Sequence, residues 1–393
     1  MQRHRAGLPL RRAARKSRQA VWLQVSGFFG MAGLYALVFA GGFATTAAGI
    51  WVLCLVAPFL GLVDTPQGRK SHLKSTPVVG GLAILMGATF AVVAGMVFRE
   101  NAAVIADVAL QHIGFFIGAG LLVVLGAMDD RKPVAARYKL LVQLIAVTTA
   151  SLMDGLQVHD FPIGFGAWQV TLGPLVVPFT ILVMLTITNA INMIDDIDGL
   201  AGGIILVGFL IMAKALVTAG FPTAPYLIAL VAAMAAFLVF NFPLLPNRPA
   251  KVFLGDAGSL VCGFTLAYLA IDLSSLPNRV FKPSTALWFF FIPVADTIWL
   301  YVRRTIAARA PFWAGRDHIH HLLMERMSAR AVAWLLVTAS GFMAAGGYLA
   351  ERRHTPGIVL IGVWTLAFLV YGAVTQKAWR RAWERGLAAR QAH

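Results

Sequence analysis

The stretch Asn189-Ala-Ile-Asn-Met-Ile-Asp-Asp-Ile-Asp-Gly-Leu-Ala-Gly-Gly203 lies between two apolar runs, where one membrane helix should end and the next should begin. A charged side chain costs about 2.5–3.5 kcal/mol at the centre of a membrane helix, so these three aspartates need cations, water or both. At helical spacing, Asn192, Asp195 and Asp196 share one face. We therefore expect a polar site at a membrane surface, built for a metal-bound phosphate. A loop of helix-capping aspartates is the alternative.

The composition is that of a polytopic membrane protein. Of 393 residues, 59% are hydrophobic and 13% are charged, whereas an ordinary soluble domain has about 25% charged residues. The alternating pattern of a membrane barrel is absent, so we predict an all-α helical bundle. The net charge of +16 favours contact with anionic lipids over nucleic acid. The two cysteines lie in apolar runs and indicate neither a disulfide framework nor a thiolate metal site.

Hydrophobic runs of about 20 residues, each long enough for one crossing, divide most of the chain. The first run, 21–63, is about twice as long, and we predict two spans with a turn at Gly41-Gly42; one long kinked helix is the alternative. A transmembrane domain of about 11–12 helices then occupies 21–375, between a basic N-terminal segment (1–20) and a basic tail (376–393) expected on anionic headgroups. Ten further spans are expected near 78–98, 108–128, 138–156, 174–194, 200–218, 225–242, 258–274, 284–302, 331–350 and 356–375.

The positive-inside rule orients this layout. With a cytoplasmic N-terminus and twelve spans, 27 of the 33 lysine and arginine residues lie on the cytoplasmic face. An eleven-span layout moves the seven basic residues of the N-terminal segment across the membrane and weakens the bias without reversing it. Aspartates used only for solubility would be scattered between faces, so we expect an active site at the cytoplasmic face. The polar residues gathered there are Asp64, Asp129, Asp130, Asp195, Asp196, Asp198, Asp256, Asp317, His72, His318, His320 and His321.

Two of the loops on this face suit a phosphate and a cation. Lys70 and His72 precede Gly80-Gly81, and basic donors beside glycines are typical of phosphate sites; anchoring by positive charge would explain the lysine but not the histidine. Adjacent Asp129 and Asp130 repel each other unless a cation lies between them, which fits a metal site or a general base. A solvated helix end neutralised by neighbouring basic residues is the alternative there.

Three later segments add polar groups. Lys139 faces the same way as Gln143 at the start of a span, and Asp256 lies between glycines that suit a hard cation, with helix capping as the alternative. Asp296, inside a span, is expected to support the site rather than enter it. The histidines of the segment 316–321 suggest zinc, but no cysteine is near. We also expect that adjacent His320 and His321 cannot both point one way in a regular helix, so with Arg316 they better suit an anionic substrate.

Together these segments resemble the polyprenyl-phosphate N-acetylhexosamine-1-phosphate transferases (glycosyltransferase family 4). The family includes the WecA-type undecaprenyl-phosphate GlcNAc-1-phosphate transferases and the phospho-MurNAc-pentapeptide transferases, and the histidine segment is similar to that of the WecA branch. The six segments occur in family order. They are Asp64-Thr-Pro…Arg69-Lys-Ser-His72…Pro77-Val-Val-Gly-Gly81, Gly126-Ala-Met-Asp-Asp130, Asn189-Ala-Ile-Asn-Met-Ile-Asp-Asp-Ile-Asp-Gly-Leu200, Val252-Phe-Leu-Gly-Asp-Ala-Gly-Ser259, Pro293…Asp296 and His318-Ile-His-His321.

The resemblance implies that a phosphate on undecaprenol attacks the β-phosphorus of UDP-GlcNAc and releases UMP, with Mg²⁺, or alternatively Mn²⁺, as cofactor. It implies Asp256 and Asp129 as metal ligands, with either Asp129 or Asp130 as the base or the group that steers the metal. A single displacement is simpler than a phospho-aspartate route. Asp195 and Asp198 match active-site acids. Lys139, Asn192 and Asn241 match nucleotide-side positions, and Lys70, His72, Arg316, His318, His320 and His321 match phosphate- and sugar-binding positions.

We therefore predict an enzyme of the bacterial inner (plasma) membrane that makes undecaprenyl-diphospho-GlcNAc and starts O-antigen or a related surface glycan. Its expected partners are the two substrates and anionic membrane lipids, with a homodimer as one assembly and no nucleic acid. The alternatives are the same transfer from another UDP-HexNAc, an inactive lipid-binding scaffold and a secondary transporter, which would hold its polar groups near the midplane. Position 196 is usually glycine in the family, so the role of Asp196 is open.

Overall fold

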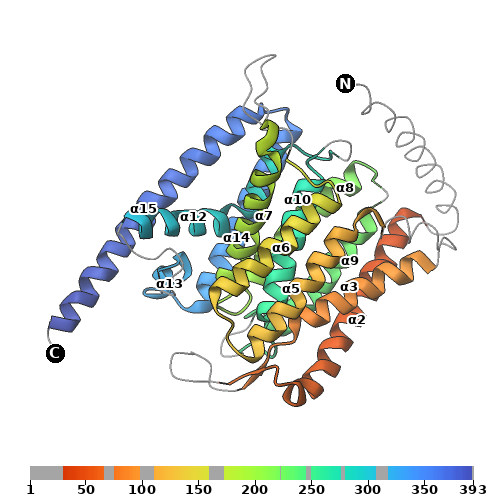
Figure 1. Ribbon diagram of the computed structural model, residues 1–393, viewed down its shortest axis with the longest axis horizontal. Coiled ribbons are helices and arrows are strands. Elements are labelled where there is room, and N and C mark those ends of the chain that lie inside the picture. Colours follow the sequence, from red (N-terminus) through yellow and green to blue (C-terminus); the bar gives the residue numbers. More distant parts are fainter. Residues whose placement is uncertain are drawn as a thin grey trace.

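The computed structural model describes residues 30–65, 75–97, 110–158, 172–221, 223–244, 249–275, 279–306 and 317–391. Nearly all of this part is helical (Figure 1), and β1 and β2 form a short antiparallel pair. The elements are α2 (Met31–Leu60), β1 (Val63–Asp64), β2 (Thr76–Pro77), α3 (Gly80–Val97), α5 (Ile113–Arg131), α6 (Ala136–Met153), η1 (Gly173–Leu175), α7 (Val176–Met193), α8 (Leu200–Thr218), α9 (Ala224–Asn241), α10 (Gly255–Asp272), α11 (Pro283–Ala286), η2 (Leu287–Phe290), α12 (Phe291–Ile306), α13 (Ile319–Met324), α14 (Ala329–Arg352) and α15 (Gly357–Gln391).

The number of long apolar helices confirms a polytopic bundle. Among the described residues, eight helices are long and apolar enough to cross a membrane. Three more helices, α3, α6 and α10, have 18 residues each and pack among those eight. The described chain thus has eleven long helices, which agrees with the lower of the two layouts expected from the sequence.

The predicted turn at Gly41-Gly42 is wrong, because both glycines lie inside α2, a single helix of 30 residues. A Cβ on Gly42 would lie 3.3 Å from the Cβ atoms of Ala232 and Ala91. This glycine therefore serves the close packing of α2 against α9 and α3 rather than a turn. Glycine is tolerated within membrane helices because the backbone has no water with which to exchange its hydrogen bonds. Residues 21–29 of the expected first span lie outside the described residues.

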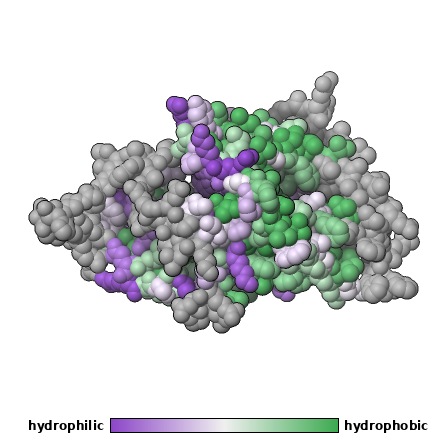
Figure 2. All heavy atoms as spheres, turned by 90° about the horizontal axis from the view of Figure 1, so that it is seen from below, coloured by the Kyte–Doolittle hydropathy of each residue, from purple (hydrophilic) through white to green (hydrophobic). Residues whose placement is uncertain are grey.

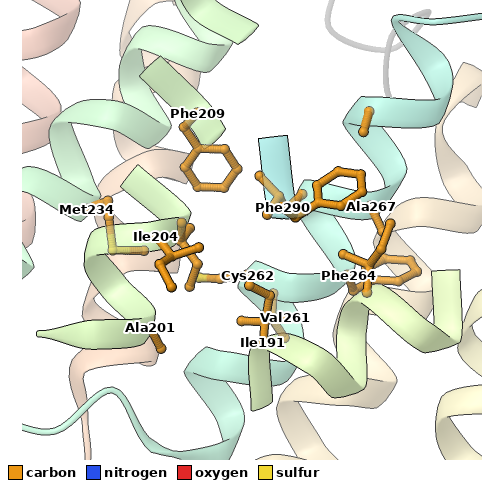
Figure 3. Close-up of a cluster of buried hydrophobic side chains, with 14 of the residues drawn as sticks. Ile191, Ala201, Ile204, Phe209, Met234, Val261, Cys262, Phe264, Ala267 and Phe290 are labelled. Carbon is orange, nitrogen blue, oxygen red and sulfur yellow. The ribbon is translucent and has the colours of Figure 1, made fainter. Parts of the chain in front are cut away.

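Helix α10 lies at the centre of the bundle, where it packs against α3, α5, α7 and α8. Its residues are buried almost without interruption from Ala257 to Ile271. Figure 3 shows Cys262 and Phe264 of this helix in a cluster of apolar side chains contributed also by α7, α8, α9 and η2. Lipid is as apolar as these side chains, so close packing rather than the hydrophobic effect holds such helices together.

Glycines bring α3 and α5 unusually close to the first turn of α10. A Cβ on Gly81 would lie 2.1 Å from the Cα of Gly258, and one on Gly126 would lie 2.2 Å from the Cα of Ala257. The chain before α10 also forms strand-like backbone bonds, from Gly80 N to Phe253 O and from Gly81 N to Leu254 O, both 2.9 Å. The first turn of α10 is thereby fixed against two neighbouring helices.

The helix ends that carry the predicted acids meet at one end of the bundle. They are the C-terminal ends of α5 and α7 and the N-terminal ends of α6 and α10, which hydrogen bonds join. Figure 2 views the molecule from below relative to Figure 1 and shows polar residues gathered near the centre and at one side of this face, next to apolar surface. A polar site at the end of an apolar bundle is the arrangement expected from the sequence.

Candidate active site

Lys139 joins two of the predicted metal ligands. Its Nζ donates to Asp129 Oδ2 and, at 3.0 Å, to Asp256 Oδ2. The lysine comes from the first turn of α6, Asp129 from the end of α5 and Asp256 from the first turn of α10. Asp129 also accepts a hydrogen bond of 2.6 Å from the backbone of Val134, in the turn between α5 and α6. Three helix ends thus contribute to one charged cluster.

Asp130 contacts backbone N–H groups, whereas its neighbour Asp129 contacts Lys139. Its Oδ1 accepts from the backbone N–H of Asp256 at 2.8 Å, and its Oδ2 accepts from that of Ala257 at 3.2 Å. These are free N–H groups of the first turn of α10, where a carboxylate is favoured by hydrogen bonding and by the helix dipole. The turn is completed by Gly255, whose φ of 76° suits glycine. Asp130 therefore caps α10 and fixes the backbone that carries Asp256.

Asn192 holds the other side of Asp256. Its Nδ2 donates to Asp256 Oδ1 at 2.8 Å and to Ser259 Oγ at 2.9 Å. Asn189, one helical turn earlier on α7, donates to Gln143 Oε1 at 2.6 Å. Asn192, from the predicted polar face, thus joins α7 to α10, and Asn189 joins α7 to α6. Both oxygens of Asp256 have a protein donor, and the carboxylate is held from two sides.

Asp195 lies among other carboxylates. Burial raises the pKa of Asp195 well above its usual value, and the nearby charges of Asp256, Asp196 and Asp130 raise it further. Its backbone lies in the turn that follows α7, outside the membrane-spanning helices. The gathering of like charges is costly, and a divalent cation would relieve that cost.

Asp196 faces the predicted histidine segment. Its Oδ2 lies 3.1 Å from His320 Nε2 and 3.2 Å from His321 Nε2. Burial alone would raise the pKa of Asp196, but hydrogen bonds from the two histidines hold it well below its usual range. The expectation that adjacent His320 and His321 cannot point the same way is wrong, since both lie in the first turn of the short helix α13, with ring centroids 4.2 Å apart.

His318 is fixed from the bundle interior. Its Nδ1 lies 2.7 Å from Asp296 Oδ2, and the other oxygen of Asp296 accepts from Tyr371 Oη at 2.7 Å and from the backbone of Ile319 at 3.0 Å. The His318 ring stacks on that of His320, with centroids 5.5 Å apart. Asp296 has the supporting position expected for it. Tyr371 gave no signal in the sequence, because it lies within the apolar run of the last span.

A further pair of arginines orients the same segment. Arg304 Nη2 donates to Asp317 Oδ1 at 2.7 Å, and Arg303 Nη2 donates to the Asp317 carbonyl at 2.6 Å. Burial alone would raise the pKa of Asp317, but its hydrogen bond and ion pair with Arg304 lower it. The sequence marks these two arginines only as positive charges at a helix end, whereas the structure places them against the start of the histidine segment.

Asn241 and Asp198 hold backbone. Asn241 is 6% exposed; it accepts from Gly199 N at 2.8 Å and donates to Val252 O at 2.9 Å. Asp198 Oδ2 accepts from Ala250 N at 3.0 Å. Both side chains therefore fasten the loop after α7 to the segment before α10. The assignments of Asn241 to the nucleotide and of Asp198 to catalysis gain no support from these contacts.

The remaining predicted site residues, Lys70, His72 and Arg316, lie outside the described residues. Within the described part, the donors at the centre of the site are carboxylate oxygens of Asp129, Asp195 and Asp256. Oxygen donors of this kind fit Mg²⁺, which is held by one or two carboxylates and completed by phosphates and water. The residues present therefore fit the metal that the sequence suggested, at the point where Lys139 already compensates part of the negative charge.

Comparison with known proteins gives consistent matches. Residues 112–274 match glycosyl transferase family 4. The chain is 34% identical over 344 residues to an undecaprenyl-phosphate alpha-N-acetylglucosaminyl 1-phosphate transferase of Yersinia pestis, covering 86% of this chain and 91% of that protein. It is 33% identical to the Escherichia coli K12 protein of the same name, covering 83% and 87%. A protein of Bacillus subtilis described as a probable transferase of this kind is 29% identical, covering 80% and 82%.

Proposed function

The chain belongs to glycosyl transferase family 4, and we propose that it transfers N-acetylglucosamine 1-phosphate from UDP-N-acetylglucosamine to undecaprenyl phosphate, releasing UMP. One observation carries the proposal beyond the family: carboxylates from the ends of α5 and α10 meet at Lys139, beside Asp195. The polar groups lie at helix ends, whereas a transporter would place them near the midplane. The lipid-linked product would start a surface glycan such as O-antigen.

In the proposed reaction, an oxygen of the lipid phosphate attacks the β-phosphorus of the donor. The bond from that phosphorus to the oxygen of UMP breaks, and UMP leaves with the electron pair. Both substrates are anionic, so charge must be neutralised before they meet. When bound, Mg²⁺ would supply this neutralisation at the diphosphate, and Asp256 and Asp129 are the residues proposed to hold it.

We assign different roles to the two adjacent acids, Asp129 and Asp130. Asp130 is assigned to positioning, because its two oxygens hold the first turn of α10. Asp129 is assigned to the metal, because it shares Lys139 with Asp256. Lys139 keeps the two carboxylates together and lowers their repulsion. Asp195, whose pKa is raised by burial and by nearby carboxylates, is proposed to bind a proton more readily than an exposed aspartate does.

The histidine segment forms the proposed second wall of the site. Asp296 fixes His318, and Asp196 joins His320 and His321 to the loop after α7. This loop also contains Asp195, so the histidine segment lies next to the carboxylate cluster. His318 is proposed to contact the phosphates or the sugar, together with Lys70, His72 and Arg316, whereas His320 and His321 face Asp196.

We further propose that the site faces the cytoplasm of a bacterial inner membrane. With α2 as a single span, its first residue, Met31, lies on the side opposite the site. Of the 33 lysine and arginine residues, 20 fall in sequence segments after α2 that are expected on the site's side, which gives that side the larger share of positive charge.

A donor comparison tests the proposed specificity. Purified chain in detergent, given undecaprenyl phosphate and Mg²⁺, should release UMP from UDP-N-acetylglucosamine faster than from UDP-N-acetylgalactosamine or UDP-glucose. Faster release from another UDP-N-acetylhexosamine would reassign the donor and leave the reaction class in place. Absence of UMP with every donor would overturn the transferase function for this chain.

A further inference from the structure

Asp196, His320 and His321 converge on one point outside the carboxylate cluster. The Asp196 Oδ2 atom lies 3.1 Å from His320 Nε2 and 3.2 Å from His321 Nε2. One ligand atom from each of the three residues lies within 4.8 Å of the others. They come from two separate elements, the loop between α7 and α8 and the first turn of α13. The tertiary fold therefore assembles two imidazoles and one carboxylate.

We propose that Asp196, His320 and His321 form a second metal site that takes a transition-metal cation such as Zn²⁺. Two imidazoles with one carboxylate are a donor set that zinc favours, whereas Mg²⁺ favours oxygen alone. Bonds of about 2.0–2.1 Å at a tetrahedral zinc place ligand atoms about 3.3 Å apart. The two observed separations of 3.1 and 3.2 Å are close to this value.

The burial of the three residues fits a site with one open position. The side chain of His320 is fully buried, that of His321 is 17% exposed and that of Asp196 is 51% exposed. A cation can therefore enter from the exposed side and keep a water or an anion as a fourth ligand, as three-ligand zinc sites do. This site would fasten the loop after α7 to α13 whether or not the chain carries out the proposed transfer.

Hydrogen bonding within the cluster leaves one histidine nitrogen unsatisfied. Both imidazoles turn Nε2 to the same oxygen of Asp196. The Nδ1 atom of His320 is buried without a hydrogen-bond partner among the described residues. A fully buried histidine usually has both ring nitrogens satisfied. One ring nitrogen of His320 therefore contacts Asp196, and the other is buried without a partner in the described part of the chain.

The test measures metal binding directly. The full chain, purified without a histidine tag and kept in excess Mg²⁺, is incubated with Zn²⁺, desalted and assayed for zinc by mass spectrometry. Titration with Co²⁺ reports the same site by its visible absorption. We expect one zinc per chain in the wild type. Asp196→Ala and His321→Ala should each weaken binding more than about 100-fold, since even changes to groups behind the ligands cost about 10- to 100-fold.

Asp256→Asn is the matched control, because it alters the carboxylate cluster and leaves the three proposed ligands in place. It should keep its zinc even if it loses UMP release, so a failure of the transferase proposal would not imitate a failure of this one. Size-exclusion profiles show which variants fold. If Asp196→Ala does not fold, His321→Ala, which changes the more exposed histidine, takes its place in the test. Zinc retained by a folded variant lacking Asp196 or His321, or zinc lost from Asp256→Asn, would overturn the proposal.

Discussion

Lys139 sets the charge balance of the site at the scale of the single residue. It donates to two carboxylates from different helices and is 21% exposed. Hydrogen bonds to charged groups contribute about 1.5–3 kcal/mol, more than those between neutral groups. Without the lysine, Asp129 and Asp256 would face each other with less compensation.

Replacing Lys139 by Met should lower kcat about 10- to 150-fold, which corresponds to about 1.5–3 kcal/mol. The Mg²⁺ concentration for half-maximal activity should not rise, because the variant leaves the carboxylates more negative. Steady-state assays of UMP release at varied Mg²⁺ measure both quantities. Lys214→Met, at an exposed position of α8, is the control and should behave as wild type. An unchanged kcat in Lys139→Met would remove the lysine from the mechanism.

Asp195 should make the stability of the protein depend on pH. Its pKa is raised in the folded state, so the cost of ionising it is absent below the usual aspartate pKa of about 3.9 and fully present above the folded pKa. Asp195→Asn should therefore raise the melting temperature at pH 8 in chelator, and the gain should shrink toward pH 5. Thermal unfolding in detergent measures this difference. An equal gain at both pH values for Asp195→Asn would contradict the assignment.

The sequence identified most of these residues by type but did not separate their roles. Asp129 and Asp130 are adjacent and chemically identical, so only the position of α10 shows that one faces Lys139 and the other caps a helix. The role of Asp196 could not be assigned from the sequence, because its partners, His320 and His321, lie more than 120 residues later in the chain. Roles that depend on a distant partner cannot be derived from local spacing.

The contact between α5 and α10 is the critical one at the scale of the element. It places Asp129 and Asp130, at the end of one helix, against Asp256, at the start of the other. Gly126 permits this approach, because a Cβ there would lie 2.2 Å from the backbone N and Cα of Ala257. Backbone atoms cannot move aside as a flexible side chain would.

Gly126→Ala should therefore push the two helices apart. Overpacking of this kind costs about 1–3 kcal/mol, and we expect a lower melting temperature and at least about a tenfold loss of UMP release. Gly120→Ala is a control in the same helix, since a Cβ there would meet no atom within 4 Å. If both variants behaved as wild type, the close approach of α5 to α10 would be irrelevant to the site.

Elements were predicted best where hydrophobic length alone defined them. The apolar runs located the helices from α3 onward, whereas Gly41-Gly42 was misread as a turn because glycine marks turns in water and close packing in a membrane bundle. The short helix α13 was also missed. Its six residues follow a polar segment, and its position depends on the contacts of His318 and Asp317 with α12.

At the scale of the whole molecule, a buried central helix carries the proposed metal ligand into a polar end of an apolar bundle. Most of α10 is surrounded by other helices, so its first turn is held rigidly while Asp256 remains accessible, with a side chain 30% exposed. The sequence predicted that the acids share one face, because charge is excluded from the apolar spans. It did not predict which helix lies at the centre, since that depends on packing between residues far apart in the chain.

The most direct test of the account is UMP release by Asp256→Asn with undecaprenyl phosphate, UDP-N-acetylglucosamine and saturating Mg²⁺. Loss of the proposed metal ligand should lower turnover about 1,000-fold or more, because metal neutralisation of phosphate charge contributes several kcal/mol. Asp272→Asn, at the opposite end of the same helix, is the matched control and should retain most of its activity. Near-normal turnover by Asp256→Asn, in protein that elutes and melts like the wild type, would contradict the central role given to the carboxylate cluster.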